Sequence, residues 1–182
     1  TFMILGNICT RSCGFCGVQT GRPETVDWDE PEKVARSIKI MNIKHAVLTS
    51  VDRDDLKDMG TLIWAETVKA IRRMNPNTTL ETLIPDFQGS EKHLDRIVDV
   101  MPEVVSHNME TVRRLTREVR IQAQYDRSLE VLRYLKKAGV RRTKSGIMLG
   151  LGETEEEVLQ TMRDLRDANV DIVTIGQYLQ PS

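Results

Sequence analysis

The feature that most constrains the fold is the regular alternation of short apolar runs with amphipathic segments along the 182-residue sequence. Strands that alternate with helices are typical of parallel sheets with right-handed crossover connections. Six strands are expected, at residues 2–8, 46–51, 79–84, 104–108, 143–149 and 171–176. The sequence therefore predicts an α/β fold with six parallel strands, the last of which has no helix after it.

The expected helices carry ordinary start and stop signals. They lie at residues 30–41, 61–74, 91–101, 111–119, 128–138 and 154–168. Pro31 lies in a first turn, where proline is tolerated, and Thr154 with Glu157 predicts a capping box. This alternation fits either an open partial barrel or a doubly wound sheet. In both architectures, ligands bind beyond the carboxyl ends of the strands.

Composition argues against two classes of partner. The chain has 26 basic and 27 acidic residues, a net charge of −1, which provides no field for nucleic acid or an anionic membrane. No apolar run reaches the length of a spanning helix, and the N-terminus does not resemble a signal peptide. We expect a single domain over residues 1–182 and neither a nucleic-acid nor a membrane partner.

All three cysteines fall in one short stretch after the first expected strand. Cys9, Cys13 and Cys16 have the spacing C-x3-C-x2-C, and the threonine, arginine, serine and glycine between them are typical of a loop. Three thiolates in one loop are typical ligands of an iron–sulfur cluster. A [4Fe–4S] cube has four irons, so three cysteines leave one iron open. Unpaired cysteines also favour a reducing compartment, the cytoplasm.

Three simpler interpretations fit the cysteines less well. A structural zinc site needs four ligands, and His45, His93 and His107 lie far away in the sequence without the usual spacing. A disulfide framework does not suit an odd number of cysteines. Inert buried thiols remain a third interpretation, although loop residues surround these three.

The motif, with Phe15 directly before the last cysteine, resembles that of the radical S-adenosylmethionine (SAM) superfamily. The resemblance implies a partial (β/α)6 barrel in which the amino and carboxylate groups of SAM chelate the open iron of a [4Fe–4S] cluster. One electron then cleaves SAM to a 5′-deoxyadenosyl radical, and this chemistry belongs to the cofactors. No side chain is therefore expected to act as a catalytic acid or base.

The second expected strand is followed by the acidic turn at residues 49–55. Many radical SAM proteins carry Gly-Gly-Glu here, which holds the amino group of SAM, and this chain departs from that pattern. A carboxylate is still available in this turn, so we expect Asp52 to accept from the ammonium and Thr49 or Ser50 to offer a hydroxyl. The alternative is a solvated turn in which Asp54 or Asp55 caps a helix.

Further SAM contacts are expected after the fourth and fifth strands. Asn108 and Glu110 suit the ribose hydroxyls, or else they cap and begin a helix, and His107 is expected to be a core or rim histidine. Residues 146–153 resemble the superfamily run G-x-[apolar]-x-G-x-x-E, in which Gly150 allows a close backbone approach.

Three more residues complete the SAM contacts that the resemblance implies. Lys144 would hold the SAM carboxylate if it points into the barrel, since a lysine there needs a partner; otherwise it is ordinary surface. The other two are Phe15 and Gln177.

Longer segments resemble one family within the superfamily, the lipoyl synthases. They lie at residues 9–16, 49–56, 81–87, 107–112, 143–146 and 176–182. The resemblance implies insertion of two sulfur atoms at C6 and C8 of an octanoyl chain on a carrier protein or lipoyl domain. Side-chain bases cannot deprotonate such C–H bonds at neutral pH. A low-potential donor such as ferredoxin or flavodoxin is the implied source of electrons.

One departure limits this resemblance. Lipoyl synthases carry an auxiliary [4Fe–4S] cluster, held by cysteines N-terminal to the barrel and by a serine in a C-terminal Arg-Ser-Ser-Tyr, and none of these residues is present. The sequence is therefore expected to be the core-domain fragment of a longer protein, unable to insert sulfur alone. The alternatives are another radical SAM enzyme, such as a biotin-synthase-like one, and a non-catalytic iron–sulfur module.

Overall fold

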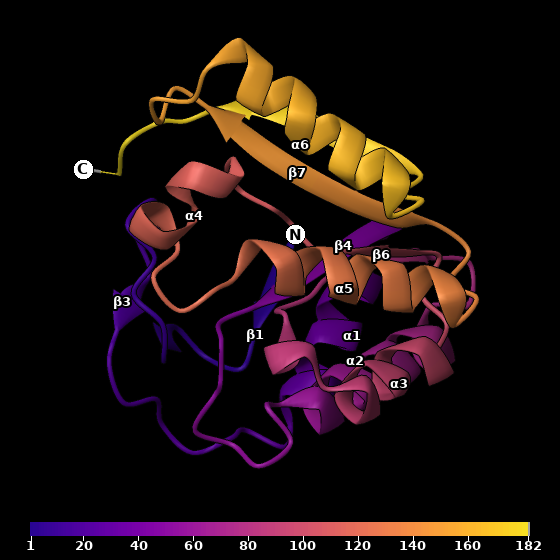
Figure 1. Cartoon of the computed structure of the whole chain (residues 1–182). Helices are drawn as coiled ribbons and strands as arrows, with labels where there is room; N and C mark the ends of the chain where they lie inside the picture. The colour runs from indigo at the N-terminus through magenta and orange to yellow at the C-terminus, as the bar shows by residue number, and fades with distance from the viewer. Residues whose placement is uncertain (182) are drawn as a thin grey trace.

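The computed structural model describes residues 1–181, and Ser182, the last residue of the run 176–182, lies outside the described residues. Its main element is a six-stranded parallel sheet in the order β1-β4-β5-β6-β7-β8. These strands are β1 (Phe2–Ile4), β4 (His45–Ser50), β5 (Thr79–Leu83), β6 (Val104–Ser106), β7 (Thr143–Leu149) and β8 (Ile172–Gln177) (Figure 1). The strand order follows the chain without the reversal of a doubly wound sheet. The expected partial barrel with six parallel strands is confirmed.

Helices lie between the strands as the sequence predicts. They are α1 (Glu30–Ile40), α2 (Thr61–Met74), α3 (Glu91–Asp99), α4 (Arg113–Val119), α5 (Tyr125–Lys137) and α6 (Glu155–Asp167), with a 3₁₀ turn, η1 (Phe87–Gly89). The capping box at Thr154 is present, with Glu157 returning a hydrogen bond. Figure 1 shows α1, α2 and α3 grouped on one side of the molecule and α6 lying along β7.

The expected strand over residues 2–8 is wrong in its second half. Leu5 has φ +68° and Gly6 has φ +88°, so the chain turns after β1. The amide of Leu5 donates to Oε2 of Glu30 at 2.8 Å, not to a neighbouring strand. The chain then forms β2 (Ile8–Cys9), which pairs with β3 (Gln19–Thr20) in a separate two-stranded sheet. This small sheet closes the cysteine loop at its base.

Two other boundaries change the position of polar residues. The fourth expected strand, over residues 104–108, ends at Ser106 in β6, which leaves His107 and Asn108 beyond the strand. Helix α4 begins at Arg113, two residues later than expected, and α5 begins at Tyr125, three residues earlier. The carboxyl end of β6 therefore carries a longer irregular segment than the sequence predicts.

The core lies between the sheet and the helices that cover it. Leu48 and Leu80 on the strands, and Trp64 and Ile71 on α2, are completely buried in its main part. A smaller cluster joins Ile147 of β7 to Leu165 of α6. Within residues 1–181, none of the helices has the length and apolar character that crossing a bilayer requires.

Candidate functional site

A cavity of about 220 Å³ lies beyond the carboxyl ends of β1, β4, β5 and β6. Most of the predicted site residues line it: Cys9, Cys13, Phe15, Cys16, Thr49, Ser50, Asp52, Asn108 and Glu110. Parallel strands bring their carboxyl ends to the same edge of a sheet, which explains why residues so far apart in sequence meet here. The structure therefore brings the three cysteines together with polar groups from several strand ends.

Backbone hydrogen bonds shape the cysteine loop. The amide of Gly21 donates to the carbonyl of Cys9 at 3.0 Å, which closes the base of the loop. The amide of Cys16 donates to the carbonyl of Cys13 at 3.1 Å, which forms a tight turn between these two cysteines. The amide of Gly14 reaches the carbonyl of Val119 at the end of α4, at 2.9 Å. The loop thus has a defined conformation that does not depend on the thiols.

Two of the thiols, those of Cys9 and Cys13, are partly buried, whereas Cys16 is exposed. The sulfur of Cys9 accepts from the amides of Arg11 and Asp52 at 3.4 and 3.3 Å. Burial raises the pKa of Cys9, and it raises the pKa of Cys13 to about 11, although the charge of Arg120 opposes the shift at Cys13. The raised pKa values favour the protonated thiols. A bound metal cation would favour the thiolates instead, because coordinated thiols lose their protons.

The residues of the cavity fit an iron–sulfur cluster with a polar molecule beside it. Among residues 1–181, no three His, Cys, Asp or Glu side chains are grouped to hold a single metal ion. A cube presents a separate iron to each thiolate, so its ligands surround it and do not converge on one point. The hydroxyl of Ser50 is buried and has no hydrogen-bond partner in the part of the chain that is described. Buried polar groups are normally satisfied, so this hydroxyl is available to a bound molecule.

The acidic turn after β4 is not the solvated helix cap considered above. Asp54 pairs with Arg11 and Asp55 pairs with Arg53. The N-cap of α2 is Gly60, and the carboxylate that accepts from its first turn is Asp58, whose Oδ2 lies 2.9 Å from the amide of Leu62. That alternative interpretation is therefore wrong for both carboxylates.

Asp52 is the carboxylate of this turn that lies closest to the cysteines. The sulfur of Cys9 and its Oδ2 are 3.9 Å apart, and its Oδ1 lies 3.3 Å from Nε of Arg11. Burial raises the pKa of Asp52 to about 6, although Arg11 opposes the shift. The group is thus suited to accept a hydrogen bond from a cation inside the cavity.

Neither Asn108 nor Glu110 caps or begins helix α4. The N-cap of α4 is Val112, while Glu110 has φ +65° and forms a bridge with Ile147 of β7. The Asn108 side chain lies over Gly146, where an added Cβ would be 3.0 Å from its Oδ1. The interpretation of these residues as cap and first-turn acid is wrong, and both side chains line the cavity.

Of the two positions expected for His107, core or rim, the structure gives a buried one at the wall of the cavity. Its ring nitrogens lie 3.0 Å from the carbonyl of Ile84 and 2.9 Å from the hydroxyl of Ser128. Burial, together with the charge of Arg120, lowers its pKa to about 4. The ring is therefore neutral at physiological pH and joins β6 to α5.

Lys144 points into the barrel and has a protein partner there. Leu83, Ser106 and Lys144 are in register on adjacent strands, so their side chains share one face. Leu83 lines the cavity, which identifies that face as the inner one. Lys144 Nζ lies 2.9 Å from Oε1 of Glu81, which also accepts from Ser106 at 2.8 Å. A SAM contact by Lys144 stays a prediction.

Gly150 and Gln177 lie together at the ends of β7 and β8. An added Cβ on Gly150 would be 2.6 Å from Nε2 of Gln177, which donates to the carbonyl of Leu149 at 3.0 Å. Neither residue is in the lining of the cavity described above. Their contact with SAM likewise stays a prediction.

Three charged residues of the site were not predicted. Arg11 and Asp86 form a buried ion pair at 2.8 Å, and Arg120 is a buried arginine in the cavity wall. A charged residue inside a cysteine loop was a signal that could have drawn attention to Arg11. Arg120 lies in an ordinary polar run after α4, and the sequence has no pattern that distinguishes it.

The chain matches known proteins along most of its length. The family model described as the Radical SAM superfamily matches residues 3–165. The chain is 87% identical over all 182 residues to the lipoyl synthase of Flavobacterium johnsoniae, and 86% identical to the mitochondrial lipoyl synthase of Nematostella vectensis. It spans 63% of the length of the first protein and 62% of the second.

Solved structures share the fold at low sequence identity. Methylornithine synthase has a TM-score of 0.78 at 16% identity, covering 98% of this chain and 53% of that one. HydG, a maturase of the [FeFe]-hydrogenase, has a TM-score of 0.79 at 15% identity, covering 99% and 43%. SuiB of Streptococcus suis bound to S-adenosylmethionine has a TM-score of 0.77 at 11% identity, covering 99% and 40%. These likenesses support the partial-barrel fold.

Proposed function

This chain belongs to the radical SAM superfamily, and from its likeness to lipoyl synthases we propose that it is the core domain of one. The proposed reaction inserts two sulfur atoms at C6 and C8 of an octanoyl group carried on a protein. The observation that carries the proposal is the gathering around one cavity of three cysteines, three carboxylates and a serine hydroxyl that has no partner within residues 1–181. Because the chain spans less than two thirds of those relatives, the reaction is proposed for the longer protein.

The three thiols are the proposed ligands of the cluster. Superfamily membership implies a [4Fe–4S] cluster and SAM, and we assign the cluster ligands to Cys9, Cys13 and Cys16. When bound, the cluster and SAM supply a carbon radical able to take hydrogen from an unactivated C–H bond, which no side chain here could do as a base. The residues of this chain bind and orient those groups.

The polar residues of the cavity are the proposed contacts of SAM. Asp52 accepts from the ammonium group, while Ser50 and Thr49 offer hydroxyls beside it. Asn108 and Glu110, which follow β6 and line the same cavity, suit the ribose hydroxyls. Phe15 lines the cavity with the cysteines and packs against the small apolar cluster at α4. Arg120 is a further cation that lines the cavity, and its burial lowers its pKa, although nearby acidic groups oppose the shift.

Other parts of the proposal concern the longer protein. We assign sulfur donation to an auxiliary [4Fe–4S] cluster whose ligands lie outside this sequence. The carrier protein or lipoyl domain that holds the octanoyl chain, and a ferredoxin or flavodoxin as electron donor, are the proposed partners. A cytoplasmic location stays a prediction from the unpaired cysteines.

The proposal is tested on the full-length protein under anaerobic conditions. After reconstitution we expect iron and sulfide to be bound, and the electron paramagnetic resonance signal of the reduced cluster to change when SAM is added. Octanoylated carrier protein should then acquire two sulfur atoms. A signal that SAM leaves unchanged would indicate a non-catalytic iron–sulfur module. Cleavage of SAM without a thiolated octanoyl product would indicate another radical SAM reaction, such as a biotin-synthase-like one.

A further inference from the structure

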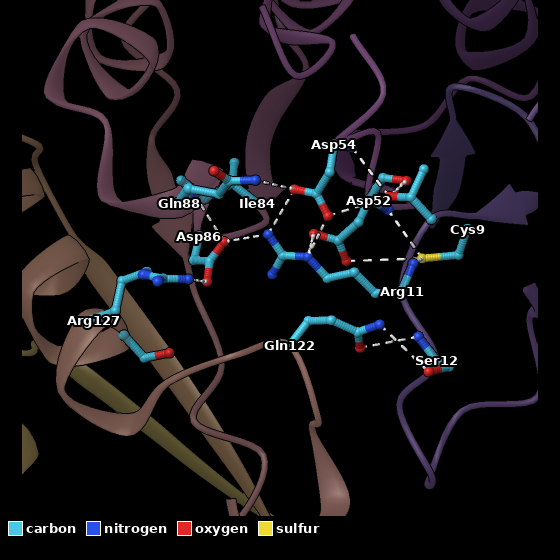
Figure 2. Close-up of polar contacts among 12 residues, drawn as sticks. Cys9, Arg11, Ser12, Asp52, Asp54, Ile84, Asp86, Gln88, Gln122 and Arg127 are labelled. Carbon is cyan, nitrogen blue, oxygen red and sulfur yellow. Dashed lines mark hydrogen bonds and ion pairs between the residues drawn. The ribbon is translucent and has the colours of Figure 1, made fainter. Parts of the chain in front are cut away.

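Arg11, which lies between the first two cysteines, is surrounded by three carboxylates (Figure 2). Its guanidinium pairs with both oxygens of Asp54, Nε with Oδ2 at 2.7 Å and Nη2 with Oδ1 at 2.8 Å. Nη2 also donates to Oδ1 of Asp86 at 2.8 Å, and Nε lies 3.3 Å from Oδ1 of Asp52. Only 5% of the Arg11 side chain is exposed. The arginine therefore joins the cysteine loop to the carboxyl ends of β4 and β5.

The carboxylate partners need this arginine. The Asp86 side chain is completely buried, and its other cation, Arg127 of α5, is 3.4 Å away. Gln88 completes the cluster. Its backbone N–H donates to Oδ1 of Asp86 at 3.0 Å, and its side-chain Nε2 donates to Oδ1 of Asp54 at 3.1 Å. A buried carboxylate that loses its partner is strongly destabilising. Movement of Arg11 out of this cluster is therefore costly.

The same residue controls the backbone of the cysteine loop. The amide of Arg11 donates to the sulfur of Cys9, and its carbonyl accepts from the hydroxyl of Thr20 at 3.1 Å. Thr10 lies beside it and binds the same turn, with its amide 3.1 Å from the carbonyl of Asp52. Fixing the Arg11 side chain thus fixes the path of the chain that leaves Cys9.

The other side of the loop is attached to the end of α4. The amide of Ser12 donates to Oε1 of Gln122 at 3.2 Å, as Figure 2 shows, and the amide of Gly14 donates to the carbonyl of Val119. These contacts and the Arg11 ion pairs involve none of the three thiols. The loop can therefore be ordered by protein contacts before any metal arrives.

We propose that Arg11, through its ion pairs with Asp54 and Asp86, is a positioning residue that holds the cysteine loop in its cluster-binding conformation in the cluster-free protein. This inference rests on the proposed function, because it concerns how the cluster site is built. Its consequence is that cluster affinity includes little cost for ordering the loop, the general advantage of preorganised ligands.

Arg53 provides a matched control on the same turn. It is as buried as Arg11, with 3% of its side chain exposed, and it pairs with both oxygens of Asp55 at 2.9 and 3.0 Å. Its remaining hydrogen bonds go to the carbonyls of Leu5 and Glu24. Arg53→Lys therefore disturbs a buried arginine on the same turn whose carboxylate partner is 35% exposed and whose hydrogen bonds reach none of residues 9–16.

The experiment measures amide hydrogen exchange in the full-length protein without its cluster. Arg11→Lys keeps the charge but loses the fork geometry, and we expect exchange of the loop amides of residues 10–16 to become about tenfold faster. Asp86→Asn should accelerate the same amides to a smaller extent. Arg53→Lys should leave them within about twofold of the wild type. After reconstitution, Arg11→Lys should lose iron to a chelator about tenfold faster.

The outcomes separate this inference from the proposed function. Unchanged loop exchange in folded Arg11→Lys, or equal acceleration in Arg53→Lys, would overturn the positioning role even if the protein binds a cluster. If the wild type binds no cluster, the proposed function fails, while the exchange comparison still decides the role of Arg11. If Arg11→Lys does not fold, wild-type exchange in Asp86→Asn would overturn the inference.

Discussion

The cavity side of the sheet and its β7–β8 side use similar charged residues in different ways. On the cavity side, Arg11 and Asp86 are paired out of contact with water. On the other side, Lys136 pairs with Asp171 while about a third of each side chain remains exposed. Exposed pairs contribute little to stability, whereas buried charges must stay paired. The comparison shows that burial, more than residue type, decides which charged groups hold a site together.

The strands also are more buried on the cavity side than on the β7–β8 side. Leu48 in β4 is completely buried, whereas Val173 and Ile175 in β8 are 37% and 48% exposed. The polar groups at the end of β4 therefore follow a strand with a fully buried core side chain, whereas those at the end of β8 follow a strand that is partly exposed within residues 1–181. Rigid support is what a preorganised binding site requires.

The largest effect is expected from removing a cluster ligand on the cavity side. Cys13→Ser should reduce reductive SAM cleavage by more than about a thousandfold, equivalent to about 4 kcal/mol of barrier. Thr174→Ser, a change on β8, should leave cleavage within about twofold of the wild type. The measurement is release of 5′-deoxyadenosine by anaerobically reconstituted protein. Undiminished cleavage by Cys13→Ser would remove the basis for the proposed cluster site.

A large effect on stability is expected from the core behind the cavity. Leu48→Ala should lower the free energy of unfolding by about 3 kcal/mol, because it removes a fully buried side chain and leaves a cavity. Val173→Ala on β8 should change it by less than about 0.5 kcal/mol. Urea unfolding measures both. Similar losses in the two variants would contradict the difference in rigidity between the two sides.

Acid should lower the free energy of unfolding by protonating His107 in the unfolded chain. The pKa of this buried ring is about 4 in the folded chain and near 6.5 when unfolded, so between these values the unfolded chain binds the extra proton. Stability should therefore fall as pH drops from about 6.5 to 4, by about 3 kcal/mol in total for this group. Urea unfolding at several pH values measures the slope. His107→Asn should have a smaller slope over this interval, and an unchanged slope would contradict the assignment.

The smallest effect concerns the SAM contacts on the two sides. Ser50→Ala should raise the dissociation constant of SAM about five- to tenfold, the loss of about 1 kcal/mol expected for one hydrogen bond. Gln177, whose contact with SAM stays a prediction, lies outside the lining of the cavity, so Gln177→Ala should raise the constant less than Ser50→Ala does. Calorimetric titration of the cluster-loaded protein measures both constants. A larger effect at Gln177 than at Ser50 would show that the β8 end contributes more to SAM binding than the cavity side and would break the comparison.

Most of the fold was predictable because local patterns determine it. The alternation of strands and helices, the capping box at Thr154 and the cysteine loop were predicted before their arrangement was known. The predicted end of the first strand was wrong because the apolar residues continue past Ile4, although Gly6 and Asn7 form a turn signal. Leu5 turns away there because its amide binds Glu30, which is 25 residues later in the chain.

The candidate site was predictable in part. Asp52, Ser50 and Asn108, which follow predicted strands, line the cavity, while their contact with SAM stays a prediction. Lys144 was correctly expected to need a partner, but Glu81 is 63 residues away in sequence and was not identified as that partner. The alternative helix-capping role for Asp54 was wrong because Arg11 takes its carboxylate. Long-range charge pairing leaves no periodic pattern in a sequence.

By itself, the sequence determined the order of strands and helices and the presence of three thiols in one loop, since backbone preferences and residue spacing act over a few positions. Only the tertiary structure decided which charges meet: Arg11 with Asp86, 75 residues apart, and His107 with Ser128. The physical reason is that folding removes these groups from water, and away from water their interactions depend on distance in space and on burial.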